Sequence, residues 1–116
     1  WIKLNKSSEG YFTGLGYWTR ANPEQCLLAT RGHPARLSKG VRKLVVEKRR
    51  EHSRKPEGIH ERIEQLVGGP YLELFGRETK RGWDSWGNQV GLFDKGAIST
   101  RRQPSSLVNG QPALFV

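Results

Sequence analysis

Residues 56–75 constrain the fold more than any other segment, because they predict a helix that is followed at once by a strand. Four apolar residues recur at helical spacing in its first part, namely Ile59, Ile63, Leu66 and Val67. They form one apolar stripe on a helix over residues 56–67, which Gly68-Gly69-Pro70 ends. Residues 71–75 alternate as a strand. A helix with such a stripe needs a sheet to cover it, which indicates the α/β class.

Three further segments predict short strands. Residues 1–4 alternate between apolar and polar side chains, and residues 26–30 and 44–46 are apolar runs between turn signals. The last two are separated by a loop that permits antiparallel pairing. About four strands and one clear helix cannot cover both faces of a doubly wound sheet, so we expect part of a larger α/β domain.

Length and composition set the size of this part. With 116 residues, of which 34% are hydrophobic, the chain makes one domain at most. We place the domain at residues 1–96 and expect the polar segment 97–116 to be a flexible tail. No apolar run approaches the ~20 residues of a membrane span, so no membrane partner is expected. The chain begins with Trp1 and shows no signal peptide, which predicts a piece of a longer cytoplasmic protein.

The charge of the chain favours a polyanionic partner, because its net charge is +9 and its isoelectric point is about 10.2. Much of the excess lies in residues 39–55, which contain eight Lys or Arg and two Glu. We predict a nucleic-acid-binding strip there. Its contacts are assigned to Lys48, Arg49, Arg50 and Arg54. The alternative is a solvated strand end and loop.

Metal and nucleophile chemistry find no support in the sequence. His33, His52 and His60 have no Cys, Asp or Glu at ligand spacing, so no zinc site is expected. The single cysteine, Cys26, lies in an apolar run and is predicted to be a small core residue. No phosphate-binding loop of the usual pattern is present.

Two local patterns combine side chains that can bind ligands. Residues 16–24 mix aromatics, a cation and a carboxylate on one loop, for which the alternative is a packed surface loop. Lys55 stands just before the predicted helix, where the helix dipole disfavours a cation. A bound carboxylate or phosphate would reconcile this lysine with the dipole, whereas the alternative is an exposed, solvated lysine.

A third pattern is a strand end followed by a polar loop, over residues 73–77 and 82–89. Ligands in open α/β sheets bind beyond the carboxyl ends of the strands. Asn88 and Gln89 offer donor and acceptor pairs that suit ribose hydroxyls. Trp83 and Trp86 are taken as core residues.

In this order, six motifs resemble the C-terminal half of the MT-A70 family of adenine methyltransferases, and the likeness is to its phage and bacterial members. The motifs are Gly-Tyr-Trp-Thr-Arg (16–20), Glu24 with Cys26-Leu27-Leu28, Arg-Gly-His-Pro (31–34), His-Ser-Arg-Lys-Pro (52–56), Glu-Leu-Phe-Gly-Arg (73–77) and Gly-Trp-Asp-Ser-Trp-Gly-Asn-Gln (82–89). Each motif alone is weak evidence, whereas six in order are strong evidence.

The resemblance implies a Rossmann-like class I methyltransferase sheet, S-adenosylmethionine as methyl donor and the exocyclic amine of adenine as acceptor. Lys55 would face the methionine carboxylate or the target base. Arg77, Asn88 and Gln89 would hold the ribose of the cofactor, and Glu73 would shape its pocket. Glu24 and Arg20 would lie on the substrate side.

The sequence departs from the family at its catalytic motif, because Asp-Pro-Pro-Trp is absent from these residues. We expect the motif upstream, so the chain would be a fragment, a truncated gene product or half of a split enzyme, inactive alone. The partners implied are the missing N-terminal half or a partner subunit, a second copy of the chain, and nucleic acid. DNA is favoured over RNA, with a bacterial or phage origin. The alternative is a non-catalytic nucleic-acid-binding or partner subunit.

Overall fold

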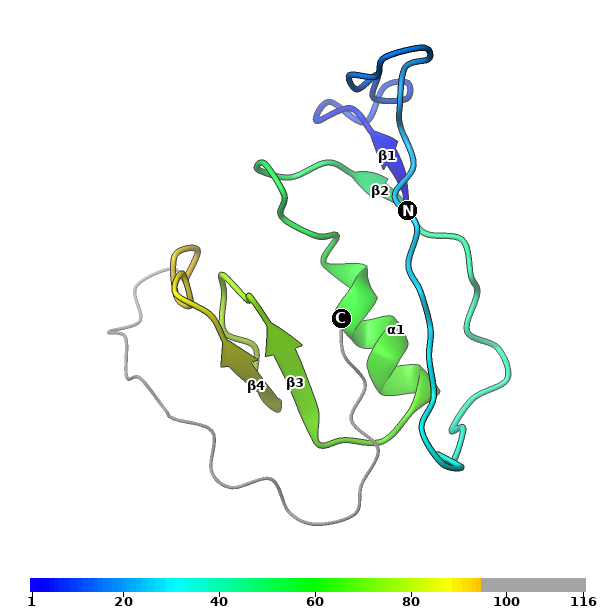
Figure 1. Ribbon diagram of the computed structural model, residues 1–116, viewed down its shortest axis with the longest axis vertical. Helices are drawn as coiled ribbons and strands as arrows, with labels where there is room; N and C mark the ends of the chain where they lie inside the picture. Colours follow the sequence, from blue (N-terminus) through cyan, green and yellow to red (C-terminus); the bar gives the residue numbers. More distant parts are fainter. Residues whose placement is uncertain (95–116) are drawn as a thin grey trace. The chain divides into compact units, whose positions relative to one another are not determined.

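The computed structural model describes residues 1–94, which divide into two compact units (Figure 1). The first unit contains residues 1–28 and 35–68, and the second contains residues 29–34 and those from 69 onward. Each unit has its own pair of parallel strands. The predicted domain end at residue 96 and the predicted tail lie outside the described residues.

The first unit holds two strands and the helix. Strand β1 (Ile2–Leu4) pairs in parallel with β2 (Val46–Lys48), with Ile2 opposite Val46. Helix α1 spans Gly58–Leu66. Ile63 of its apolar stripe is buried, as is Val45 just before β2. The predicted helix and the predicted first strand are therefore confirmed, with ends that differ by one or two residues.

The start of α1 is fixed by a side chain from β2. The residue before the helix, Glu57, makes no side-chain cap, but the Glu47 carboxylate accepts a hydrogen bond from the Gly58 N–H at 3.4 Å. A carboxylate at this point suits the partial positive charge of a helix N-terminus. This contact couples the end of β2 to the beginning of α1.

Three predictions in this part of the chain are wrong. Residues 26–30 form no strand, and Cys26 is exposed instead of lying in the core. The strand predicted at residues 44–46 begins at Val46, and it pairs in parallel with β1 rather than antiparallel with residues 26–30. A strand needs a hydrogen-bonding neighbour, which β1 supplies to β2; no described strand lies beside residues 26–30.

The second unit is built on β3 (Tyr71–Leu74) and β4 (Trp83–Trp86), which are parallel. Tyr71 lies opposite Trp83, and their rings stack with centroids 4.8 Å apart. Trp83 is buried, which confirms its predicted core position. Trp86 is 52% exposed, so the same prediction for it is wrong. The strand predicted at residues 71–75 is confirmed, whereas the segment that forms β4 was expected to be a loop.

One helix and two parallel strand pairs make a small α/β structure, as the sequence predicts. Parallel pairing is typical of α/β proteins, in which helices cover the sheet faces. Within residues 1–94, no helix has the length and apolar content that crossing a membrane requires.

Candidate functional site

Glu24 is held beside β1 by its own main chain. Its N–H donates a hydrogen bond to the carbonyl oxygen of Trp1 at 2.9 Å, and the main-chain nitrogen of Trp1 donates to the carbonyl oxygen of Glu24 at 2.7 Å. Two residues that exchange both main-chain bonds are paired as in an antiparallel sheet. The side chain of Glu24 therefore starts from a defined position.

Asn22 ties the preceding loop to β1. Its Oδ1 accepts a hydrogen bond from the Lys3 N–H at 3.0 Å, and its Nδ2 donates to the carbonyl oxygens of Lys3 and Phe12 at 2.8 and 2.5 Å. Between Phe12 and Asn22 the loop is open to solvent, as the exposed fractions of Tyr17 (94%) and Trp18 (91%) show. The packed-loop alternative is therefore wrong at this tip, where Arg20 is also exposed.

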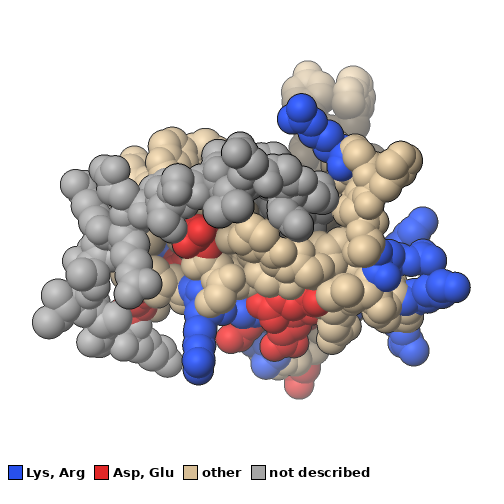
Figure 2. Space-filling view, turned by 90° about the horizontal axis from the view of Figure 1, so that it is seen from below, with Lys and Arg blue, Asp and Glu red and all other residues tan. Residues whose placement is uncertain are grey.

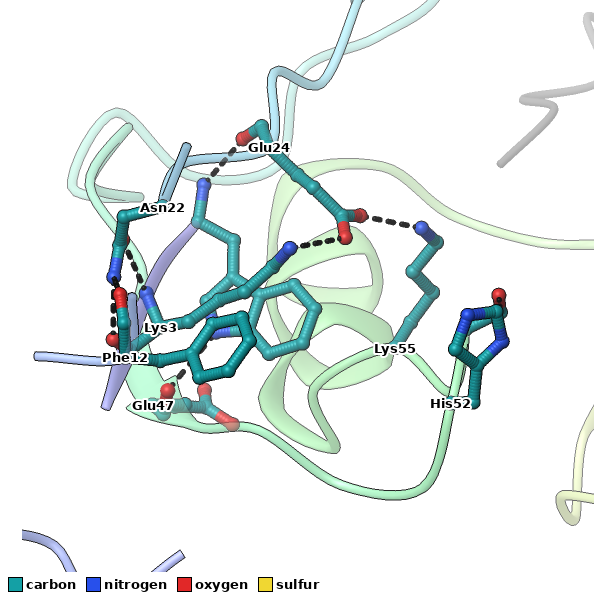
Figure 3. Close-up of polar contacts among 9 residues, drawn as sticks. Lys3, Phe12, Asn22, Glu24, Glu47, His52 and Lys55 are labelled. Atoms are coloured by element: carbon teal, nitrogen blue, oxygen red, sulfur yellow. Dashed lines mark hydrogen bonds and ion pairs between the residues drawn. The ribbon is translucent and has the colours of Figure 1, made fainter. Parts of the chain in front are cut away.

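The carboxylate of Glu24 lies between two ammonium groups (Figure 3). Its Oε1 is 2.7 Å from Lys3 Nζ, and its Oε2 is 2.5 Å from Lys55 Nζ. The two lysines differ in burial, because the Lys3 side chain is 19% exposed and the Lys55 side chain 54% exposed. The structure thus brings together Glu24, which the resemblance places on the substrate side, and Lys55, which it places at the methionine carboxylate or the target base.

These contacts set the ionisation of Glu24. Partial burial by itself would raise the pKa of the carboxyl group, but the hydrogen bonds and charges of Lys3 and Lys55 outweigh it, so the pKa lies below the usual 4.5. Glu24 is consequently a carboxylate at neutral pH. A carboxylate only accepts hydrogen bonds, so this group can receive an N–H of an amine.

The position of Lys55 before α1 predicts an anion beside it, and the structure shows which anion this is. Lys55 lies three residues before the first residue of α1, and the anion beside it in this structure is the Glu24 carboxylate. Its ammonium group is therefore partnered rather than simply solvated. Because its side chain is half exposed, it can also be reached by an anion from solvent.

The residues predicted for the cofactor ribose lie in the second unit, where the carboxyl ends of β3 and β4 meet at one edge. Glu73 is on β3 opposite Ser85, and Arg77 follows that strand. Gly87 packs closely here, since a Cβ atom built on it would lie 3.0 Å from Phe75 Cα. Asn88 and Gln89 come directly after Gly87, at the edge where ligands of parallel sheets bind.

The loop after β4 folds back onto Arg77. The guanidinium of Arg77 lies 5.0 Å from the ring centroid of Phe93, whose N–H donates to the Arg77 carbonyl oxygen at 3.0 Å. Asp94 accepts hydrogen bonds from the N–H and hydroxyl of Thr79, both at 2.8 Å. These supporting residues carry no signal in the sequence, because Asp94 stands in a polar, glycine-bearing stretch without periodicity. The side chains of Asn88 and Gln89 are exposed.

The four basic residues predicted to bind nucleic acid have different surroundings. Lys48 and Arg49 are exposed, and the Arg49 guanidinium lies 4.4 Å from the ring centroid of Phe12. Arg50 is half-buried. Arg54 is 15% exposed and pairs with Glu51 at 2.9 Å. The backbone hydrogen bond of Glu51 and, after it, this pairing with Arg54 lower the pKa of Glu51. Figure 2 shows that Lys and Arg side chains project from the face in view.

No group of three or more His, Cys, Asp or Glu in residues 1–94 is placed to hold a metal ion. An open hollow of about 360 Å³ lies in the first unit, lined mainly by charged and polar groups such as Arg42, Glu47 and Arg62. None of the predicted site residues lines it. His60, which the sequence analysis considered as a ligand, is buried on α1.

Comparison with known proteins gives a family match over most of the chain. The family model described as MT-A70 matches residues 1–89. The match therefore includes both groups of predicted site residues, those of the first unit and those of the second.

Curated relatives agree with this match. The chain is 33% identical to a putative N(6)-adenosine-methyltransferase MT-A70-like protein of Medicago truncatula, over 97% of the chain and 20% of the relative. It is 30% identical to the N(6)-adenosine-methyltransferase subunit METTL3 of Danio rerio, over 94% and 20%. It is 35% identical to the MT-A70-like protein of Drosophila melanogaster, over 78% and 16%. The chain thus spans a fifth or less of the length of these relatives.

Proposed function

The chain belongs to the MT-A70 family, and from this premise we propose that it is part of an S-adenosylmethionine-dependent methyltransferase that acts on the exocyclic amine of adenine. The observation that carries the proposal is the Glu24 carboxylate held between Lys3 and Lys55. Such a cluster offers an acceptor for an amine and a cation for an anionic group in one place.

Each side chain of the first unit has a role in this proposal. Lys55, half exposed, binds the methionine carboxylate of the cofactor through an ion pair. Glu24 accepts a hydrogen bond from the exocyclic amine and so orients its nitrogen toward the methyl group that the cofactor supplies. Arg20, exposed on the neighbouring loop, lies on the substrate side.

The family resemblance assigns the ribose of the cofactor to residues of the second unit, which is described by itself. Asn88 and Gln89 present exposed amides at the carboxyl edge of β3 and β4, where they can bind the two ribose hydroxyls. Glu73 lies on β3, and Arg77 follows that strand. The proposal takes these parallel strands to be part of a Rossmann-like sheet, in which cofactors bind beyond the carboxyl ends of the strands.

The acceptor polymer is the point on which the relatives and the sequence analysis differ. The motifs favour DNA through their resemblance to phage and bacterial proteins. The relatives named above are eukaryotic, and their names specify adenosine, which is the ribonucleoside. This observation favours adenine in RNA as the second candidate substrate, so both polymers belong in the assay.

The catalytic motif that the sequence lacks also belongs to this proposal. We expect methyl transfer to need an Asp-Pro-Pro-Trp segment from outside these residues, either from the same protein or from a partner. The zebrafish relative is named as a subunit, which fits a function exercised within an assembly. A non-catalytic nucleic-acid-binding subunit is the alternative, and it predicts no use for Lys55 toward the cofactor.

Calorimetric titration of S-adenosylmethionine into the chain tests the proposal. The wild type should bind, and Lys55→Ala should bind at least about tenfold more weakly because a charge-assisted bond is lost. Lys6→Ala is the matched control: it removes an exposed lysine near β1 and should bind as the wild type does. Equal binding by Lys55→Ala and wild type would refute the role of Lys55.

Methyl transfer tests the substrate. The full-length protein should transfer labelled methyl groups to the N6 position of adenine in single-stranded oligonucleotides, and RNA and DNA of one sequence should be compared side by side. Oligonucleotides in which adenine is replaced by guanine serve as controls. Labelling of both sequences alike would contradict adenine specificity, and absence of both cofactor binding and labelling would favour the non-catalytic alternative.

A further inference from the structure

Lys3 has no assigned role in the site, yet it is the most firmly held of the three charged residues. It is the central residue of β1, opposite Glu47 of β2, and Asn22 bonds to both its N–H and its carbonyl oxygen. Its ammonium group lies 5.4 Å from the ring centroid of Trp1. The Trp1 indole in turn donates a hydrogen bond to the Glu47 carbonyl oxygen at 3.0 Å.

Lys3 and Lys55 therefore make different kinds of contact with Glu24. The ion pair with Lys3 joins β1 to the segment whose main chain is hydrogen-bonded to Trp1, and its lysine is only 19% exposed. The ion pair with Lys55 reaches from the segment before α1, and its lysine is 54% exposed. Exposed ion pairs contribute little and exchange readily, whereas partly buried pairs in a fixed geometry persist.

We propose that Lys3 is a positioning residue, which keeps the Glu24 carboxylate in place when Lys55 exchanges Glu24 for the carboxylate of the cofactor. The inference rests on the proposed function, because that function supplies the anion for Lys55. In this exchange, the Lys55 ammonium group pairs first with the Glu24 carboxylate and then with the carboxylate of the cofactor. Without Lys3, its departure would leave Glu24 partly buried and unpaired, which disfavours the exchange.

The charged groups that face Glu24 are few. Lys3 approaches its carboxylate from β1 and Lys55 from the segment before α1, while the Trp1 nitrogen contacts only its carbonyl oxygen. The titration of the Glu24 carboxyl group therefore reports which lysine is bound to it. Removal of either cation raises the pKa of this group, and removal of both raises it further.

The test is a carbon-13 NMR titration of the glutamate carboxyl groups in the full chain. Lys55→Met imitates the released state without any ligand, and here the pKa of Glu24 should stay below that in the double variant Lys3→Met/Lys55→Met. Glu24 in Lys3→Arg should titrate as it does in the wild type, since this variant keeps a cation at position 3. Lys6→Met, which removes an exposed lysine three residues away, should leave Glu24 unchanged. Identical titration of Lys55→Met and the double variant would overturn the proposal, and dispersed spectra verify that each variant is folded.

Saturating S-adenosylmethionine supplies the second arm. In the wild type the cofactor should raise the pKa of Glu24 only as far as its value in Lys55→Met, whereas in Lys3→Met it should raise the pKa to the value in the double variant. The affinity of Lys3→Met for the cofactor should be roughly fivefold lower than that of the wild type, because one partly exposed ion pair usually contributes that much. Unchanged affinity and titration in Lys3→Met would overturn the exchange. Absence of any cofactor binding to the wild type would refute the proposed function, while the ligand-free arm still decides whether Lys3 holds Glu24.

Discussion

A carboxylate that touches two lysines gains stability from its charge, and at Glu24 the gain exceeds the loss from partial burial. The same contacts that lower its pKa also link three separate segments of the first unit: β1 through Lys3, the loop before residue 26, and the segment before α1 through Lys55. The ionisation of one side chain should therefore be visible in the stability of this unit.

The first prediction concerns Glu24→Gln and pH. The folded-state pKa of Glu24 is lower than its unfolded value, so its contribution is complete above about pH 4.5 and is lost as the pH falls through the folded-state pKa. At pH 7 the variant should be less stable by about 1 kcal/mol, the range of exposed ion pairs. Urea unfolding at several pH values measures this difference. A difference that stays constant down to pH 3 would contradict the assignment.

At the residue scale, the sequence predicted which kinds of chemical group form the site better than it predicted which of these groups are in contact. The position of Lys55 before the helix indicated an anion, but nothing in the spacing of Glu24 showed that its carboxylate would lie there. The two residues are 31 positions apart, and the segment between them contains the incorrectly predicted strand. Lys3 gave no signal at all, because a lysine within an alternating strand is usually solvated.

At the scale of elements, the approach of two loops decides the shape of the second unit. A Cβ atom on Gly87 would lie 3.0 Å from Phe75 Cα and 3.3 Å from the Gly76 carbonyl oxygen, which are main-chain atoms that cannot turn aside. Gly87 thus permits the loops after β3 and β4 to lie side by side.

The second prediction follows from this contact. Gly87→Ala should destabilise the second unit by about 1–3 kcal/mol, because the loops must separate or strain. It should also weaken cofactor binding, since Arg77 and Asn88 flank the contact. Gly68→Ala is the control, because a Cβ atom there meets nothing within 4 Å and should change stability by less than about 0.5 kcal/mol. Thermal unfolding of both variants gives the comparison, and equal effects would show that the loops do not meet as described.

The third prediction separates two members of the basic segment. Lys48 is exposed, whereas Arg54 is mostly buried and paired with Glu51. Lys48→Ala should lower the affinity for single-stranded nucleic acid and reduce the slope of log affinity against log salt by about one. Arg54→Ala should change the slope less, because its charge is already compensated. Fluorescence anisotropy over a range of salt concentrations measures both slopes, and equal slopes would remove this distinction.

Some helices and strands could be predicted from the sequence because their local signals agree, and others could not. Helix α1 has four apolar residues on one stripe and a Gly-Gly-Pro stop, two independent signals that agree. Strand β4 reads Trp-Asp-Ser-Trp between glycines, and its buried Trp83 and exposed Asp84 alternate over only four residues. The apolar run at 26–30 gave a strong strand signal, but a strand exists only beside a partner. That partner is a long-range feature which no local pattern records.

At the scale of the molecule, little apolar surface is buried for the number of apolar residues present. The buried hydrophobic residues of the described part are Val45, Ile63 and Trp83, while Leu15, Leu27 and Leu44 are each more than 60% exposed. Where exposed apolar groups form one contiguous patch, the patch marks a surface that another protein segment covers. The chain spans a fifth or less of its relatives' length, so most of each relative lies outside the matched part.

The last prediction contrasts a covered with an uncovered apolar residue. Ile63→Ala, at 6% exposure, should lower the free energy of unfolding by about 2–4 kcal/mol, because it leaves a cavity in the first unit. Leu27→Glu, at 89% exposure, should change it by less than about 0.5 kcal/mol but should reduce self-association, since it places a charge on a surface that a second copy or a partner would cover. Sedimentation velocity at rising protein concentration, together with urea unfolding, separates the two effects. Loss of stability in Leu27→Glu comparable to that of Ile63→Ala would mean that residue 27 is packed inside the unit, and the uncovered surface would then have to lie elsewhere.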